Sequence, residues 1–123
     1  MVNHQTLGGR PAGLTPEHLA VLRADLLEQR LFRREQLRQL AAARPSQAGG
    51  PRREAASRAE VRARLTASAR MVLADVEAAL ARMAEGCYGT CQLCRRPIAL
   101  EHLTIVPQAR HCGGCLRGRE AAR

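Results

Sequence analysis

Two pairs of cysteines near the C-terminal end of the sequence constrain this chain more than any other feature. Cys91 and Cys94 form one C-x2-C pair, Cys112 and Cys115 form a second, and seventeen residues separate the two pairs. Each pair can form a tight turn with both sulfurs facing inward, so four thiolates can surround one tetrahedral ion, for which zinc is the best candidate. A single C-x2-C pair also fits redox chemistry, but two pairs at this separation are typical of a zinc ribbon.

Four protein ligands fill the coordination sphere of zinc and leave no position for a reactive water, so the sequence predicts one structural ion. Zinc binding of this kind contributes about 10–16 kcal/mol, enough to fold a small segment with little core of its own. We interpret Cys87 as a spare thiol, with the alternative that it displaces a ligand, and His111 is a further alternative ligand. Four arginines flank the pairs and either offset the charge of the thiolates or are simply solvated: Arg95, Arg96, Arg110 and Arg117.

Composition narrows the class of protein. With 123 residues, one Phe and one Tyr, the chain has room for one small domain plus an extension. Four of its five cysteines stand in C-x2-C pairs and no charged-then-apolar leader is present, so we expect a cytoplasmic protein. No uncharged apolar run is long enough to span a bilayer, and no membrane association is expected. The net charge of +9 comes from arginine without any lysine, which reflects either GC-rich codon usage or an anionic partner.

Two long helices are predicted before the cysteines. Residues 1–14 are interpreted as a flexible arm, and Thr15 and Pro16 mark a helix start, with the helix running to about residue 43. A second helix starts either at Pro51 or at the capping box that opens with Ser57, and it ends near residue 85 with Gly86 as the C′ residue. Apolar residues follow helical spacing at Leu19, Leu22, Leu26, Leu27, Leu31, Leu37 and Leu40 in the first helix, and at Val61, Leu65, Ala69, Val72, Val76, Ala79 and Met83 in the second.

These patterns predict a mainly α fold, a long antiparallel coiled-coil hairpin on a small C-terminal four-cysteine zinc-finger domain. The hairpin spans residues 15–86 with its turn at about 44–57, and the finger with a short tail spans residues 87–123. Counted from Ser57, the two helices are of equal length, about 42 Å each. The apolar stretch 97–107 is predicted to form one or two short strands or turns over the metal, and the tail a final helical turn or two.

The C-terminal half resembles the DksA/TraR-type zinc-finger family, whose finger uses four cysteines. The likeness covers roughly residues 61–117 and rests on Ala79, Leu80, Met83, Gly86, Tyr88, Gly89, Ile98, His102, Leu103, Pro107 and Ala109 together with the four paired cysteines. It implies a bacterial transcription factor that binds RNA polymerase rather than promoter DNA. In that family the hairpin enters the secondary channel, the finger stays on its rim, and some members act with guanosine tetraphosphate.

The tip of the hairpin departs from this family. Its best-known members carry an acidic Asp-x-x-Asp-Arg-Ala motif, and Ala48 and Pro51 stand where the aspartates would be. Arg52 keeps the arginine, and the candidate tip contacts are Arg52, Arg53 and Glu54. From residue 30 to 70 there are eleven arginines against three glutamates, so a face in contact with an anion is predicted there.

No combination of residues typical of an enzyme occurs in the sequence, and we expect no catalysis. Two alternatives to polymerase binding stay open. An arginine-rich zinc-finger protein can bind nucleic acid directly through the hairpin, and its affinity would then fall steeply with salt. A coiled-coil adaptor would ignore polymerase and bind another protein. The chain is expected to act as a monomer.

Overall fold

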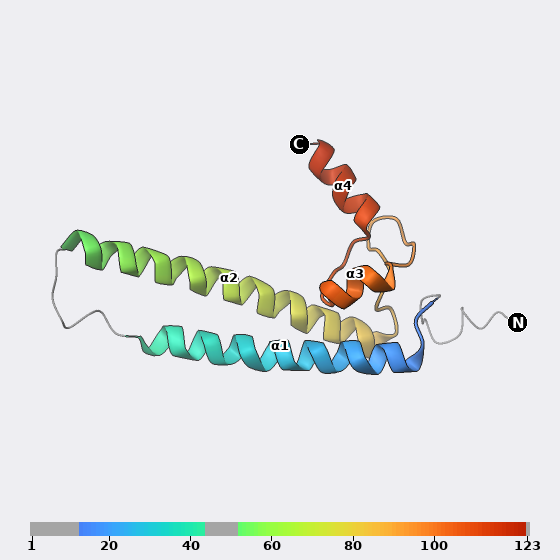
Figure 1. Ribbon diagram of the computed structural model, residues 1–123, viewed down its shortest axis with the longest axis horizontal. Helices are drawn as coiled ribbons and strands as arrows, with labels where there is room; N and C mark the ends of the chain where they lie inside the picture. Colours follow the sequence, from blue (N-terminus) through green and yellow to red (C-terminus); the bar gives the residue numbers. More distant parts are fainter. Residues whose placement is uncertain (1–12, 44–51, 123) are drawn as a thin grey trace, which may run out of the picture.

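The computed structural model describes residues 13–43 and 52–122. Residues 1–12 of the predicted arm and the turn positions 44–51, which include Ala48 and Pro51, lie outside the described residues. Four helices occur in the described ranges: α1 Pro16–Ala42, α2 Arg52–Glu85, α3 Leu100–Ile105 and α4 Gly113–Ala122. Figure 1 shows α1 and α2 side by side and antiparallel, with α3, the intervening loops and α4 gathered at one end. The predicted mainly α fold, a hairpin on a small four-cysteine domain, is confirmed.

The start of α1 is fixed by two reciprocal hydrogen bonds. The N–H of His18 donates to the Thr15 hydroxyl at 3.0 Å, and the N–H of Thr15 donates to Nδ1 of His18 at 3.1 Å. Together they satisfy two backbone donors that a helix end otherwise leaves free. The cap at Thr15 was predicted, and His18 supplies the second half of the capping box.

The second helix is longer than the first. It begins at Arg52, so the earlier of the two predicted starts is close to the observed one, and residues 52–57 are helical rather than part of the turn. With 34 residues against 27, the helices are not equal in length as predicted. The predicted end is confirmed: Gly86 has φ of +82°, and Cys87 N–H donates to the carbonyl of Arg82 at 3.0 Å, which closes the helix C-terminus.

The core lies at the base of the hairpin, where both helices meet the cysteine-bearing segment. Leu26 and Val76 are fully buried and share one cluster with Tyr88 and Leu103 from the C-terminal part. Leu14, predicted at the end of a flexible arm, is 5% exposed in the same cluster, so the ordered part of the chain starts before Thr15. The hairpin and the small domain therefore share a single core.

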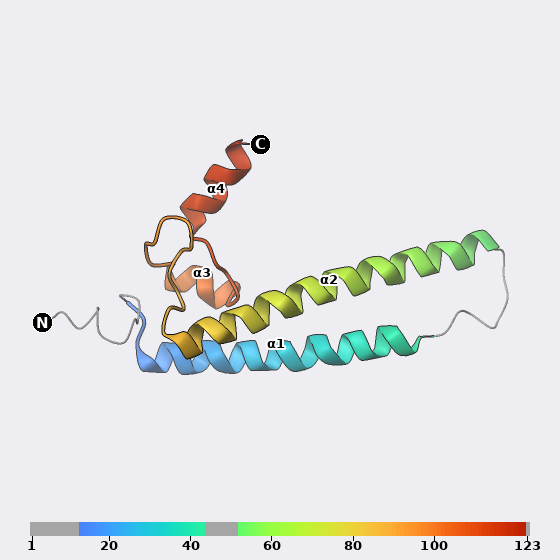
Figure 2. The ribbon, with the colours of Figure 1, turned by 180° about the vertical axis from the view of Figure 1, so that it is seen from behind.

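Away from the base the two helices draw apart, as both ribbon views show (Figures 1 and 2). Val61 and Leu65 continue the predicted stripe of α2 but are 54% and 46% exposed. Leu31, predicted on the apolar face of α1, is 69% exposed and so lies outside the packed seam. The coiled-coil contact is therefore closed from the base to Ala69, which is 1% exposed, and loose from Leu65 toward the tip.

The segment between the two cysteine pairs differs from the prediction. Instead of strands or turns over the metal, it holds the helix α3, and strand pairing in the described residues is limited to one bridge between Thr90 and Pro97. Leu100 and Leu103 stand one helical turn apart and pack into the core, which favours a helix over an alternating strand. The predicted helical tail is confirmed as α4, which begins inside the second cysteine pair.

Within the described ranges, no helix is both long enough and apolar enough to cross a membrane.

Candidate metal centre

The first cysteine pair lies on a tight loop closed by backbone hydrogen bonds. Cys91 N–H donates to the carbonyl of Arg96 at 2.8 Å, and Arg95 N–H donates to the carbonyl of Cys91 at 2.9 Å. Arg95 adopts φ of +67°, a left-handed conformation that lets the chain reverse directly after Cys94. The loop therefore holds both thiols of the pair on one turn.

The second pair is held by the start of α4. Cys115 N–H points to the sulfur of Cys112 at 3.4 Å, and Leu116 N–H donates to the carbonyl of Cys112 at 3.0 Å. The two loops are joined by a hydrogen bond of 2.9 Å from the N–H of Gln92 to the carbonyl of Arg110. This bond brings the loops together although their residues are eighteen apart in the chain.

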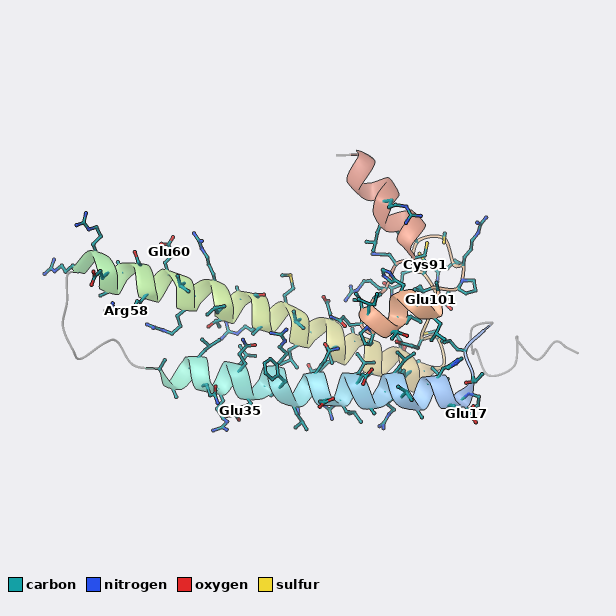
Figure 3. The ribbon with its side chains drawn as sticks, in the orientation of Figure 1. Glu17, Glu35, Arg58, Glu60, Cys91 and Glu101 are labelled. Atoms are coloured by element: carbon teal, nitrogen blue, oxygen red, sulfur yellow. The ribbon has the colours of Figure 1, made fainter. Side chains whose placement is uncertain are left out.

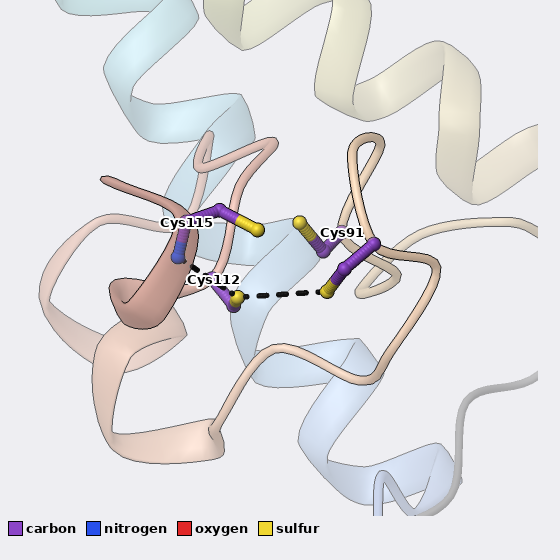
Figure 4. Close-up of side chains that lie close together, drawn as sticks. Cys91, Cys112 and Cys115 are labelled. Carbon is purple, nitrogen blue, oxygen red and sulfur yellow. Dashed lines mark hydrogen bonds between the residues drawn. The ribbon is translucent and has the colours of Figure 1, made fainter. Parts of the chain in front are cut away.

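The four sulfurs of Cys91, Cys94, Cys112 and Cys115 all lie within 4.8 Å of one another. Figure 4 shows the labelled thiols turned toward a common centre. The sulfurs of Cys94 and Cys112 are 3.7 Å apart, close to the about 3.8 Å edge of a tetrahedron with zinc–sulfur bonds of about 2.3 Å. All four are free thiols. The cluster can hold one metal ion, and its donor set and spacing fit the zinc of a DksA-type finger.

The thiols of the cluster are already polarised by their surroundings. Burial acts to raise the pKa of Cys91, but the backbone N–H groups of Cys94, Cys112 and Leu93 outweigh it and lower the pKa to about 5. The N–H of Cys115 likewise lowers the pKa of Cys112. The Cys115 thiol donates to Cys112 and Cys91, which raises its pKa to about 12. Crowded thiolates need a cation before all of them can lose their protons.

Two arginines support the loop that carries the second cysteine pair. Arg110 forms an ion pair of 2.8 Å with Asp75 of α2, and the buried Arg82 donates to the carbonyl of Ala109 at 3.3 Å. The base of α2 therefore anchors the chain two residues before Cys112. Sequence patterns gave no reason to single out Asp75 or Arg82, because a long-range pair between exposed-looking charges leaves no periodic signal.

The other candidates near the metal lie outside the cluster of sulfurs. The thiol of Cys87 is exposed, with Glu85 as its neighbour at 3.8 Å, and neither Cys87 nor His111 belongs to the group of convergent ligand atoms in the described residues. Tyr88, one of the residues that carry the family resemblance, is 2% exposed in the core. Of the flanking arginines, Arg110 is committed to Asp75, and Arg95 and Arg96 are exposed.

The predicted tip residues lie at the other end of the hairpin from the cysteines. Arg52, Arg53 and Glu54 form the first turn of α2, and all three side chains are exposed. Arg58 and Glu60, farther along the same helix, are exposed as well (Figure 3). The structure thus separates a cysteine cluster at the base from a charged surface at the tip.

The fold and the cysteine cluster together define the class of protein to which this chain belongs. It is a helical hairpin with four convergent cysteine thiols at its base. No protein-family model matches the chain, and no curated protein matches its sequence. Among solved structures, the chain is similar to transcription factor DksA2 from Pseudomonas aeruginosa, with 25% identity and a TM-score of 0.71 over 98% of each chain. The resemblance to the DksA/TraR-type family is thereby confirmed for the fold, and the four-cysteine cluster agrees with it.

Proposed function

We propose that this protein is a transcription regulator of the DksA/TraR type that binds RNA polymerase through its helical hairpin. The observation that carries the proposal is the structural match to a transcription factor over 98% of both chains, hairpin included. The hairpin has the form that this role requires, a long rod with its core and cysteine cluster at one end and an exposed charged tip at the other. The DksA-like fold is that of a transcription factor family, and we propose no catalytic activity for the chain.

The metal has a structural role in this proposal. Cys91, Cys94, Cys112 and Cys115 are proposed to hold one zinc ion, and no position is then left for a substrate or a reactive water. The thiolates require a reducing compartment, which supports a cytoplasmic site of action. Because the two helices bury their apolar seam against each other, we take the functional unit to be a monomer.

In this proposal the tip enters the secondary channel and the cysteine-bearing base stays on its rim. Among the described residues, Arg52, Arg53 and Glu54 in the first turn of α2 would then be candidate contacts with the polymerase. An arginine-rich tip attracts carboxylates and repels metal ions, the reverse of an acidic tip. The resemblance in fold therefore supports a polymerase partner, while the direction of regulation depends on the charge of this tip.

The proposal is tested by mixing the zinc-loaded protein with core RNA polymerase at moderate salt and measuring the complex by size exclusion. A photo-crosslinking residue at Arg53 is expected to capture the wall of the secondary channel, and one at Leu93, exposed beside the metal centre, is expected to capture the rim. The Leu93 probe is the matched control, since it reports the base rather than the tip. Failure to form a complex, or capture of distant sites by the Arg53 probe, would refute the proposal.

One observation favours a second candidate, direct binding of nucleic acid. The described part of the tip half, residues 30–43 and 52–70, contains ten arginines and three glutamates. Phosphate contacts predict that the logarithm of the affinity for any duplex falls linearly with the logarithm of salt concentration. A flat dependence, or no binding to duplex at physiological salt, would exclude this candidate. Duplex binding that survives when polymerase binding fails would favour it over the first.

A further inference from the structure

The two helices border an open cleft of about 490 Å³ in the tip half of the hairpin, beside the buried Ala69. This volume lies in the range of small-molecule sites. The cleft belongs to the tip half of α1 and α2, whereas Cys91 is labelled at the base of the hairpin (Figure 3). Its lining residues come from both helices: Arg34, Leu37, Arg38, Ala41, Thr66 and Arg70.

Three guanidinium groups line this cleft, and they differ in how they are paired. Arg34 crosses from α1 to Glu77 of α2 with an N–O distance of 2.8 Å, and Arg38 pairs with Glu35 on its own helix. None of the ion pairs among the described residues includes Arg70. The cleft thus holds one unpaired positive charge, and two more whose carboxylate partners are at least 42% exposed and easily exchanged.

The rest of the lining is apolar or already bonded. Leu37 and Ala41 form an apolar wall, and the Thr66 hydroxyl donates to the carbonyl of Arg62 at 2.9 Å. The donors left to a ligand are therefore those of the three arginines. A guanidinium presents a planar fork of N–H groups that matches two phosphate oxygens at once.

The long-range charge distribution favours the same ligand. The tip half, residues 30–43 and 52–70, carries ten arginines and three glutamates, whereas the base half, residues 16–29 and 71–85, carries two arginines and six carboxylates. The hairpin is thus positive at one end and negative at the other. An anion that approaches it is directed to the tip half, where the cleft lies.

We propose that this cleft binds an anion carrying two or more phosphate groups, with Arg70 as its principal contact and Arg34 and Arg38 as its flanks. Binding draws Arg34 away from Glu77, because one guanidinium cannot pair fully with both. The phosphates are those of a free polyphosphate or of a nucleic-acid backbone, which share the same recognition chemistry. The site does not depend on polymerase binding, so either proposal can fail without the other.

Isothermal titration calorimetry with inorganic tripolyphosphate, on the full zinc-loaded chain at fixed ionic strength, tests the site. Arg70→Gln is expected to weaken binding about tenfold or more, since it removes a charge-assisted contact. Arg58→Gln is the matched control, because it removes the same charge from an exposed position on the same helix outside the cleft, and it is expected to change the affinity less than about twofold. Equal weakening by the two variants would overturn the proposal, since it would mean attraction by net charge alone.

A second variant changes the affinity in the opposite direction. Glu77→Gln releases Arg34 toward the cleft and is expected to strengthen tripolyphosphate binding about two- to fivefold. Glu60→Gln, which neutralises a carboxylate paired with Arg64 outside the cleft lining, is its control and is expected to leave the affinity within twofold. Failure of Glu77→Gln to exceed Glu60→Gln would count against the proposed role of Arg34.

The source of the phosphates is distinguished by a competing ligand. A short DNA duplex that displaces tripolyphosphate, with the same loss on Arg70→Gln, would identify a nucleic-acid backbone as an occupant of the cleft. A duplex that binds without displacing tripolyphosphate would assign the cleft to a free polyphosphate. The proposal is overturned if Arg70→Gln binds both ligands as tightly as the wild type does and circular dichroism shows that this variant is folded.

Discussion

The hydroxyl of Tyr88 donates a hydrogen bond of 2.8 Å to the carbonyl oxygen of Pro107, nineteen residues further along the chain. Tyr88 is 2% exposed and lies three residues beyond the end of α2, and Pro107 lies two residues beyond the end of α3. This bond therefore connects the end of the hairpin to the segment that leads into the second cysteine pair.

Burial raises the pKa of Tyr88 to about 12, with a smaller opposing effect from the charge of Arg82. Because the pKa of the folded state lies above the unfolded value of 10, Tyr88 contributes stability that is fully present below pH 10 and is lost as the pH rises through 12. Tyr88→Phe is expected to reduce stability at neutral pH by about 1–2 kcal/mol through the lost bond and the unpaired carbonyl. In the wild type, ultraviolet absorbance of tyrosinate measured during alkaline titration should rise only near the folded-state value. A transition at pH 10 in the native protein would contradict the buried, bonded state.

The two cysteines nearest the end of α2 are expected to behave differently. Cys91→Ser removes a fully buried sulfur from the cluster, so the variant purified with excess zinc is expected to hold the metal far more weakly and to lose structure in the C-terminal part. Cys87→Ser changes an exposed thiol outside the cluster and is expected to keep one zinc per chain. Metal analysis by mass spectrometry and circular dichroism measure both effects.

If both variants retain one zinc per chain, Cys91 is not a ligand. Loss of zinc from Cys87→Ser alone would instead assign the fifth cysteine to the site, the alternative that its spacing left open. In the wild type and in Cys87→Ser, removal of zinc by a chelator is expected to affect the hairpin as well, because the core at the base of α1 and α2 includes Cys91.

Two leucines of α1 that share the predicted apolar face are expected to differ sharply in their contribution to the free energy of unfolding. Leu26 is fully buried, and Leu31 is 69% exposed. Leu26→Ala is therefore expected to lower the free energy of unfolding by about 2–5 kcal/mol, because it leaves a cavity in the shared core. Leu31→Ala, the control on the same helix, is expected to change it by about 0.5 kcal/mol or less. Urea denaturation followed by circular dichroism compares them, and similar losses would mean that the seam continues past the base.

The contrast between these leucines shows what sequence patterns predict and what they do not. Local signals predicted the helix start at Thr15 and the helix end at Gly86, because each of these is decided by residues within a few positions of one another. The convergence of the two C-x2-C loops was predicted for another reason, since four thiolates are needed to surround one zinc ion. Which apolar residues are buried depends on how α1 and α2 are aligned and where they diverge. Helical periodicity in one helix carries no information about that alignment.

The segment between the cysteine pairs and the arginine cleft were missed for related reasons. A short apolar run such as 97–107 fits a strand or a helix equally well by pattern, and its packing against the base of the hairpin favours the helix α3. The cleft joins Arg34 to Arg70, which are 36 positions apart in the sequence. The sequence indicated an anionic contact from the surplus of arginine, but the site itself depends on the space between two helices.

The left-handed conformation of Gly86 supplies the last prediction. Its φ of +82° lets the chain leave α2 and turn toward Tyr88, and any residue with a Cβ is strained there by about 1–2 kcal/mol. Gly86→Ala is therefore expected to lower the thermal midpoint of the zinc-loaded protein. The matched control is Gly118→Ala in α4, where an added Cβ meets no atom within 4 Å and alanine favours the helix, so this variant is expected to leave the midpoint unchanged or raise it. A loss in both variants would point to a general intolerance of glycine replacement, and no loss at Gly86 would show that α2 does not end in the left-handed turn.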